Sequence, residues 1–489
     1  MKVRCAVSAL TAMIAFALST TARAQLPVDG QPIKTNHYSI DLYQGPVLAS
    51  TRVIGLAGAF VAIGEGVEGD TQNPAAPAVR VPWSNAHFDY DLGLGVTFPA
   101  TIKNSDFFNS GSTTKLPKGT TGGFVFLDAA ANLQLGKWGF GLTSDLQEYA
   151  LNGAAVQTKS DQLVAQISVT HLQLARAFAD GQIIVGAGDR IATFSVQHQN
   201  EFTATQQDLF TSVGNGYEFG FLLRPNDEQF RIGGAYRSEV NSRASGNTIP
   251  QPVTDLYLPE RVTVPWDLDL GMAIQLGPRP LNPRWIDPVI ELERIKRFLH
   301  WRQLERERYR RFELERVRNI HGDVDAAARA LDVELATEAA LDEATLSRAE
   351  DKEDQDIRYK VLAMQRFHVL IVSSLVVSGT AREAVGVESF LERTTQRSGT
   401  SLSYSPRVGL ETESAPNWLR LRAGSYLEPT RFPSNQRGAR VHGTLGFDEK
   451  LFHWTVFGLF HEDTHWRAGG SLDAARDYFG WSVAIGVWH

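Results

Sequence analysis

The sequence has very little cysteine and no long hydrophobic run, and both absences narrow the class of protein. Its one cysteine, Cys5, lies within the first 24 residues, so the rest of the chain has no thiol for a disulfide or for thiolate chemistry. No later stretch reaches the roughly 18 uninterrupted apolar residues of a transmembrane helix. The nearest, residues 369–377, is interrupted by Ser373 and Ser374. A helical membrane protein is therefore not expected.

The first 24 residues have the pattern of a cleaved export signal. Lys2 and Arg4 precede the apolar run of residues 7–18, and Ala22 and Ala24 supply the small residues of a cleavage site. The run is too short to cross a bilayer as a helix. We expect a signal peptide over residues 1–24 and export of the remainder, although a soluble periplasmic protein would begin in the same way.

Charge and hydropathy exclude one class of partner and favour one class of fold. The net charge of −7 and the pI near 6.0 do not suit a nucleic-acid binder, and no motif requires a cofactor. Hydrophobic residues make up 43% of the chain, yet the mean hydropathy is −0.20. This combination is typical of transmembrane β-barrels, whose outward positions are apolar while the inward ones stay polar or small.

Large apolar residues alternate with small or polar residues along most of the chain. The pattern occurs in residues 90–98, 138–143, 266–275 and 479–487. A soluble β-sandwich also alternates, but it turns its charged side chains toward water and its aromatic side chains toward a shared core. The last stripe ends beside Trp488, as in a lipid-facing closing strand with an aromatic girdle, although the chain ends at His489 rather than at an aromatic residue.

Turn signals separate these strand-like runs. Asp180-Gly181 lies between two such runs, and Pro225-Asn226-Asp227 lies between two more, as in β-hairpins. Counting the runs gives twelve to fourteen strands. The sequence therefore predicts an all-β fold: a transmembrane antiparallel β-barrel of about 14 strands over residues 86–489.

Residues 25–85 do not have the pattern of barrel strands. They contain the run Arg52-Val53-Ile54-Gly55-Leu56-Ala57-Gly58-Ala59-Phe60, followed by Asn73-Pro74-Ala75. Small residues at these positions allow a backbone segment to pack closely in a crowded interior, and a proline fixes a turn. An ordinary glycine-rich strand followed by a loop is the alternative.

This run and turn resemble the FadL-type outer-membrane transporters of long-chain fatty acids and other hydrophobic compounds, and PorV-like relatives share the hatch motif. Residues 233–240 and 258–260 continue the likeness in the same order. The resemblance implies that residues 25–85 form an N-terminal hatch that plugs the barrel. It also implies that apolar ligands enter from outside and leave past the hatch through a lateral opening, with Phe60, Asn73, Pro74 and Ala75 near the ligand path.

Residues 286–365 interrupt the barrel pattern with a highly charged helical one. Residues 291–318 hold ten Lys or Arg and six Glu, whereas residues 323–356 hold twelve Asp or Glu and three Lys or Arg. Gly322 is a candidate C-cap and Asp323 a candidate N-cap. We predict a helical hairpin whose basic and acidic arms attract. Two solvated helices in a long loop are one interpretation, and a protein-binding site over residues 291–356 is the other.

Two enzyme motifs occur in the sequence. Residues 64–69 match the G-x-G-x-x-G of dinucleotide-binding folds, but Pro74 and Pro77 oppose the long helix that such a fold needs next. His461-Glu462-Asp463-Thr464-His465 matches H-E-x-x-H, in which a helix places two histidines on zinc and the glutamate acts as base. Its surroundings favour a strand and a loop, and no glutamate follows closely as the third ligand. The alternative is a polar loop between the last two strands. We therefore predict no catalytic residue, with a zinc protease as the minor alternative.

These observations together favour passive uptake of hydrophobic small molecules across an outer membrane through a plugged barrel. The expected partners are outer-membrane lipid and a hydrophobic small-molecule ligand, with no cofactor and no nucleic acid. The alternative from another class is a structural or secretion-associated barrel that binds proteins through the charged helices.

Overall fold

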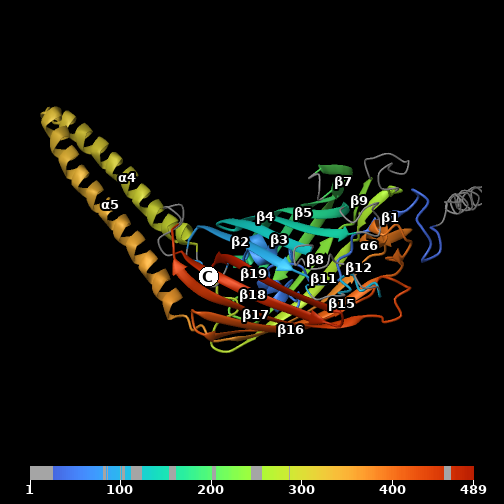
Figure 1. Cartoon of the computed structure of the whole chain (residues 1–489). Coiled ribbons are helices and arrows are strands. Elements are labelled where there is room, and N and C mark those ends of the chain that lie inside the picture. Colours follow the sequence, from blue (N-terminus) through green and yellow to red (C-terminus); the bar gives the residue numbers. More distant parts are fainter. Residues whose placement is uncertain are drawn as a thin grey trace, which may run out of the picture.

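The computed structural model describes residues 26–80, 84, 86–99, 101, 105–111, 124–152, 161–200, 205–243, 256–285, 287–455 and 464–488. The expected export signal, residues 1–24, lies outside these ranges. Fourteen of the described strands form one closed antiparallel barrel (Figure 1), which confirms the predicted fold class. In order around the barrel they are β11 (Asp267–Leu276), β12 (Val369–Ser378), β15 (Ser403–Ala415), β16 (Leu419–Glu428), β17 (Arg440–His453), β18 (His465–Ala475), β19 (Tyr478–Val487), β2 (Phe88–Phe98), β3 (Phe124–Leu135), β4 (Trp138–Asn152), β5 (Asp161–Phe178), β6 (Ile183–Asn200), β7 (Thr205–Leu223) and β8 (Phe230–Arg237).

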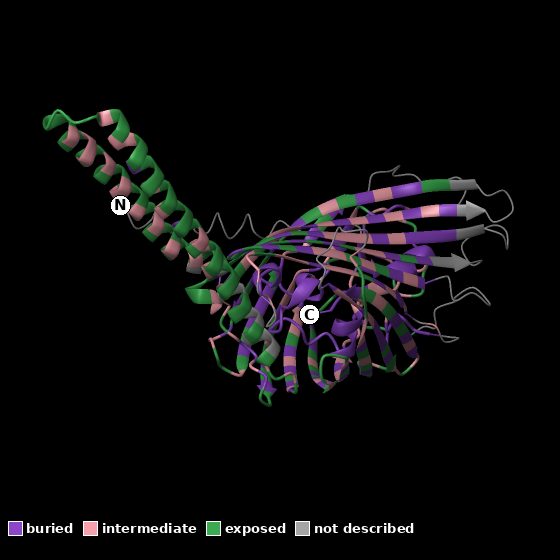
Figure 2. Ribbon diagram, turned by 90° about the vertical axis from the view of Figure 1, so that its left-hand side faces the viewer, coloured by how far each residue is buried: buried purple, intermediate pink, exposed green. Residues whose placement is uncertain are grey.

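The alternating pattern places large apolar side chains on the outside of the barrel. On β4, Trp138, Phe140 and Leu142 are exposed, whereas the intervening Gly139 and Gly141 are buried. Figure 2 shows the same banding of exposed and buried residues along the strands. An apolar outer band around a closed barrel is the surface that a lipid bilayer covers, so the barrel spans a membrane.

The two ends of the barrel differ. At one end, here called the short-turn end, brief connections join β3 to β4, β5 to β6, β7 to β8 and β15 to β16. Connections at the opposite, long-loop end are mostly longer and include a second sheet of β14 (Arg397–Ser398), β13 (Ala384–Gly386), β1 (Ser39–Asp41), β10 (Arg261–Val264) and β9 (Val240–Arg243). A core of buried apolar residues that includes Ile40, Phe107, Phe194 and Phe390 of α6 (Val387–Leu391) forms around this sheet.

The described part of the N-terminal segment lies against the inner side of the barrel wall and is called the hatch here. It contains α2 (Thr51–Gly55), α3 (Gly66–Asp70) and the short 3-10 helix η1 (Ala76–Ala78), all fully buried. Helix α2 contacts β16 to β19, α3 contacts β2 to β4, and η1 contacts β3 to β6. Only a segment enclosed by the wall touches strands this far around the ring, so the hatch fills the lumen.

The charged insertion is a hairpin of two long helices that leaves the short-turn end (Figure 1). These are α4 (Pro288–Asn319) and α5 (Val324–Ala363). Arg302 of the basic arm lies 2.6 Å from the Asp342 carboxylate of the acidic arm, and Arg310 lies 2.7 Å from Asp332. The predicted pairing of the two arms is therefore present. No helix in the described ranges is both long enough and apolar enough to cross a membrane.

The cap between the helices differs from the prediction by one residue. Asp323 accepts hydrogen bonds from the Asp325 and Ala326 amides, as expected of an N-cap. At the end of α4, however, the residue with positive φ is His321 (57°), and the amide of Gly322 donates to the Val317 carbonyl. In this Schellman arrangement the left-handed position precedes the glycine, so histidine takes the conformation that glycine was expected to adopt.

Candidate functional site

The Asn73-Pro74-Ala75 turn fastens the hatch to the barrel wall. The Asn73 side-chain amide donates to the carbonyls of Val61, 2.8 Å away in the hatch, and Phe221, 3.1 Å away on β7. Its Oδ1 accepts from the amide of Ala75 at 3.0 Å. A single buried asparagine thus closes the turn and joins it to the wall, so the turn is held by specific contacts rather than by shape alone.

Glycines on the inner face of the wall make room for this turn. A Cβ added at Gly186 on β6 would overlap the Pro74 carbonyl, and one at Gly220 on β7 would overlap the Asn73 side chain. The same holds for Gly139 on β4, whose added Cβ would overlap the backbone of Pro77. These glycines are required because the hatch backbone lies directly against the strands.

Phe60 is fully buried within the hatch. It belongs to an apolar cluster with Val53 and Ile63, and the Arg52 guanidinium lies 5.1 Å from its ring centre. It lines neither of the two cavities described below. A role for Phe60 in a ligand path therefore stays a prediction, and its contacts in the structure are those of a hatch core residue.

An ionic network ties α2 to one side of the barrel. Arg52 donates two hydrogen bonds to the Glu411 carboxylate on β15, at 2.9 and 2.8 Å. Arg422 on β16 lies 2.6 Å from both Glu411 and Asp448 of β17. The inward-facing arginines of β16 thus pair within the lumen, and Arg420 likewise lies 3.4 Å from Glu413. Each charge is buried and compensated, which makes removal of one partner costly.

A second anchor joins the hatch to the root of the helical hairpin. Arg231 on β8 is completely buried, and its guanidinium lies 2.7 Å from the carboxylate of Glu65 in the hatch. It also donates to the Ile63 carbonyl at 2.9 Å, the Leu281 carbonyl at 2.6 Å and Asn282 Oδ1 at 2.6 Å. Burial alone would raise the pKa of Glu65, but Arg231 and then Arg52 lower this pKa to about 2.

A cavity of about 210 Å³, here called the lumen cavity, lies on the long-loop side of the hatch turn. Its walls are part apolar and part charged. Apolar side chains include Leu42, Val169, Val264 and Val376, and charged side chains include Arg190, Arg237, Asp267 and Asp269. A wall of this composition suits a ligand that has a long apolar part and few polar groups.

Arg237 is the side chain that connects this cavity to the hatch. It donates to the carbonyls of Thr71 at 2.6 Å and Gln72 at 2.7 Å, and it pairs with Asp267 on β11. Arg190 on β6 lies 3.4 Å from the same carboxylate. Asp267, an inward polar residue of the predicted strand, is therefore part of a lumen ion network that holds the hatch edge.

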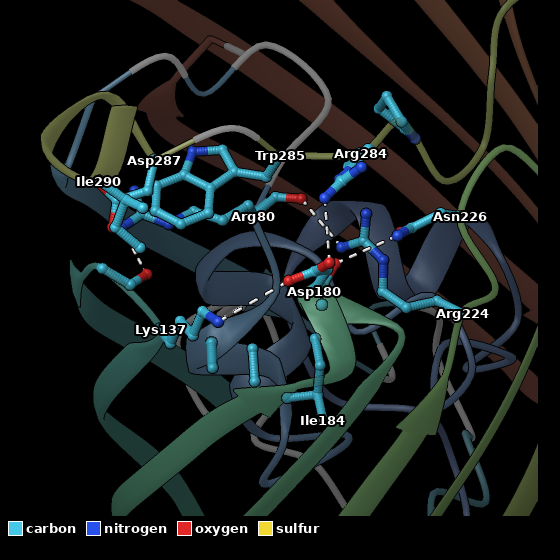
Figure 3. Close-up of a pocket in the computed structure, with 15 residues that line it drawn as sticks. Arg80, Lys137, Asp180, Ile184, Arg224, Asn226, Arg284, Trp285, Asp287 and Ile290 are labelled. Atoms are coloured by element: carbon cyan, nitrogen blue, oxygen red, sulfur yellow. Dashed lines mark hydrogen bonds and ion pairs between the residues drawn. The ribbon is translucent and has the colours of Figure 1, made fainter. Parts of the chain in front are cut away.

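A second cavity of about 250 Å³, here called the rim cavity, lies on the other side of the turn, at the short-turn end. The hatch contributes Ala78 and Arg80 to it, whereas Thr71 and Gln72 line the lumen cavity. Residues 73–75 therefore lie between the two cavities along the chain. Figure 3 shows the rim cavity, with side chains from the hatch, the wall turns and the segment before α4.

Sequence reasoning found the hatch turn but not the arginines that hold it. Arg231 and Arg237 lie on the face of β8 opposite the exposed Phe230, Ile232 and Tyr236. The available sequence signal for these two arginines was a charged residue on the inner face of a barrel strand that borders the hatch. Their partners in the hatch are more than 150 positions away in the sequence, so no local pattern identifies them.

The H-E-x-x-H motif falls largely outside the described residues, which include neither His461 nor Glu462. His465 is the first residue of β18, a strand, whereas the metalloprotease motif requires both histidines on a helix. Among the described residues, no group of three or more His, Cys, Asp or Glu is placed to hold a metal ion. That the chain is not an enzyme stays a prediction.

Comparison with known proteins gives structural similarity without sequence similarity. No protein-family model and no curated protein matches the sequence. Among solved structures, the chain is similar to a Pseudomonas aeruginosa FadL homologue, with 10% identity, a TM-score of 0.49 and coverage of 91% of this chain and 99% of that one. It is also similar to the CymD monoaromatic hydrocarbon channel (9% identity, TM-score 0.46, 91% and 97% coverage). A third is the P. putida toluene transporter TodX (12% identity, TM-score 0.44, 91% and 98% coverage). At such identities the ligand of this chain has to be inferred from its own geometry.

Proposed function

We propose that this chain is an outer-membrane channel for the passive uptake of hydrophobic small molecules such as long-chain fatty acids. The observation that carries the proposal is the position of the Asn73-Pro74-Ala75 turn between the lumen and rim cavities. The lumen cavity has walls that are part apolar and part charged, and the hatch residues beside it are held by a few hydrogen bonds from Asn73 and Arg237. Displacement of residues 71–80 would join the two cavities without unfolding the barrel.

The lengths of the connections support a direction for this passage. Outer-membrane barrels have short turns on the periplasmic side and longer loops outside the cell. On this basis the long-loop end lies outside, and the rim cavity and the helical hairpin lie in the periplasm. A ligand would then enter from the long-loop end, occupy the lumen cavity and leave past the hatch.

The pairing of the barrel strands limits the routes by which a ligand could leave the lumen. Each described barrel strand pairs with both of its neighbours, and the ring is closed. The registers of β19 with β2 and of β7 with β8 are the shortest, with six residue pairs each. A lateral opening, which the resemblance implies, therefore stays a prediction and would require two strands to part. Passage along the axis requires only movement of the hatch.

The proposal is tested by filling the lumen cavity. Val169 on β5 lines the cavity, and Leu172 on the same strand faces the lipid. We expect the folded protein in nanodiscs to bind a labelled long-chain fatty acid saturably. Val169→Trp should weaken this binding, whereas the matched Leu172→Trp should leave it unchanged. Equal binding by both variants, or no saturable binding to the unmodified protein, would contradict uptake through this cavity.

A second candidate function is supported by the surface of α4. Phe298, Trp301 and Phe312 lie on one face of this helix and are each more than half exposed, on a helix rich in arginine. Exposed aromatic side chains beside arginines are typical of protein-binding surfaces. We therefore also propose that residues 291–356 hold an acidic protein partner in the periplasm. Phe298→Ser with Phe312→Ser should abolish co-purification of such a partner and leave fatty-acid binding intact, and a partner that still co-purifies would rule out this surface.

A further inference from the structure

The rim cavity has a charged side chain that no acidic group contacts among the described residues, although Glu65, itself paired with Arg231, acts on it from a greater distance. The other charged side chains that line it each have a polar or charged partner. Lys137 and Arg284 lie 3.9 and 3.1 Å from the Asp180 carboxylate, and Asp287 lies 2.9 Å from His87. Arg80 lies 3.8 Å from the carboxylate of Asp89. Arg224, the remaining cation of the lining, has no carboxylate within 4.0 Å among the described residues.

Arg224 is buried at the inner wall of the cavity (Figure 3). Its side chain follows the last residue of β7, and the residue is only 4% exposed. One terminal nitrogen donates to the Arg80 carbonyl at 3.2 Å, while Nε has no acceptor within the described structure. Burial and then the nearby Arg231 lower the pKa of Arg224 to about 9, so it stays charged at neutral pH. A buried cation without a counterion is unfavourable unless an anion joins it.

The same cavity has a second unpaired donor and an apolar floor. The indole Nε1 of Trp285 is buried and has no hydrogen-bond partner in the described structure. Ala78, Ala177 and Ile184 form an apolar surface between the hatch and the wall, and the Arg80 guanidinium covers the Trp285 ring at 4.4 Å. The lining thus offers the buried Arg224 guanidinium for an acidic group, and apolar and aromatic contact for the rest of a small molecule.

We propose that the rim cavity is a binding site for a small organic carboxylate, whose acidic group is held by Arg224 and whose apolar body packs on Ile184 and the Trp285 ring. A volume of about 250 Å³ lies just below the roughly 300–1,000 Å³ of sites for drug-sized ligands, which suits one ring or a short chain. The site is separate from the lumen cavity, and the inference does not depend on whether the lumen transports a ligand.

Binding of benzoate to the folded protein in nanodiscs, measured by equilibrium dialysis, tests the proposal. Benzoate has one carboxylate and one ring, and benzyl alcohol is an uncharged molecule of similar shape. We expect one saturable benzoate site and binding of benzyl alcohol about 10-fold weaker or less. Arg224→Gln should weaken benzoate binding about 10- to 100-fold, the usual range for a hydrogen bond to a charged group. Lys137→Gln, at the half-exposed cation already paired with Asp180, should change it less than about 3-fold.

Further variants separate this site from the lumen and from a simple anion site. Trp285→Ala, which removes an aromatic ring from the lining, should weaken binding several-fold, so it tests the site if Arg224→Gln does not fold. Val169→Trp should leave benzoate binding unchanged, and its loss in this variant would place the site in the lumen and overturn the proposal. Equal binding of benzyl alcohol, unchanged binding in Arg224→Gln, or equally tight competition by inorganic phosphate would each overturn it as well.

Discussion

The close packing of the hatch on the barrel predicts that one methyl group loosens the plug. Gly186 on β6 faces the hatch, and a Cβ added there would overlap the carbonyl of Pro74, which is backbone and has no rotamer to adopt instead. Gly186→Ala should therefore displace the turn that Asn73 holds. Gly443 on β17 is the matched control, because an added Cβ there meets nothing within 4 Å.

The expected size of the effect follows from the cost of overpacking. Inserting a methyl group into a well-packed interior costs about 1–3 kcal/mol. If the closed hatch bears this cost and the displaced hatch does not, opening becomes about 5- to 150-fold more frequent, since 1.4 kcal/mol is about tenfold. The Asn73 side chain accepts from the Ala75 amide, so exchange of this amide reports the opening directly.

Hydrogen exchange measured by mass spectrometry on the folded protein is the assay. In Gly186→Ala, peptides that cover residues 60–80 should lose protection by about the factor given above, while peptides of β3 to β6 keep theirs. Uptake of a hydrophobic probe into liposomes should rise in parallel. Equal protection in Gly186→Ala and Gly443→Ala would refute the reasoning, and loss of protection throughout the barrel would show global destabilisation instead of hatch movement.

Three further predictions concern the charged contacts. Arg231→Met leaves the buried Glu65 carboxylate without its closest partner, so the free energy of unfolding from thermal denaturation should fall by about 3–5 kcal/mol. The control Arg297→Met, at an exposed arginine, should change it little. Because the pKa of Glu65 is lowered from 4.5 to about 2, its stabilisation is fully present above pH 4.5 and is lost as the pH falls toward 2; thermal scans over this range should show a decline of about 3 kcal/mol that is absent in Glu65→Gln. Asp342→Asn removes the partner of Arg302 and Arg306, so proteolysis within residues 288–363 should be faster than in the unmodified chain at low salt, and this difference should shrink at high salt. Cleavage that is insensitive to salt in both proteins would contradict the pairing of the arms.

The site was only partly predictable from sequence. The Asn73-Pro74-Ala75 turn was identified because it resembles the hatch turn of the FadL-type family, and a proline at this position is expected to fix a turn. Arg231 and Arg237 were missed because their partners are hatch carbonyls and carboxylates far away in the sequence. That Arg224 has no carboxylate in contact could not be predicted from sequence. It depends on how three wall turns and the segment before α4 are arranged around the rim cavity.

The sequence by itself determined the class of the fold, because side chains alternate across a strand and the large apolar ones of residues 138–143 must then meet the membrane. It also determined the helical hairpin, since opposite charge predominates in the two arms. The tertiary structure decided what local patterns do not contain: the closure of the ring between β19 and β2, and the course of the hatch across the lumen. The closure and the contacts of α2 join residues hundreds of positions apart, while α3 and η1 contact strands that follow them more closely; together these contacts place the cavities on either side of the hatch turn.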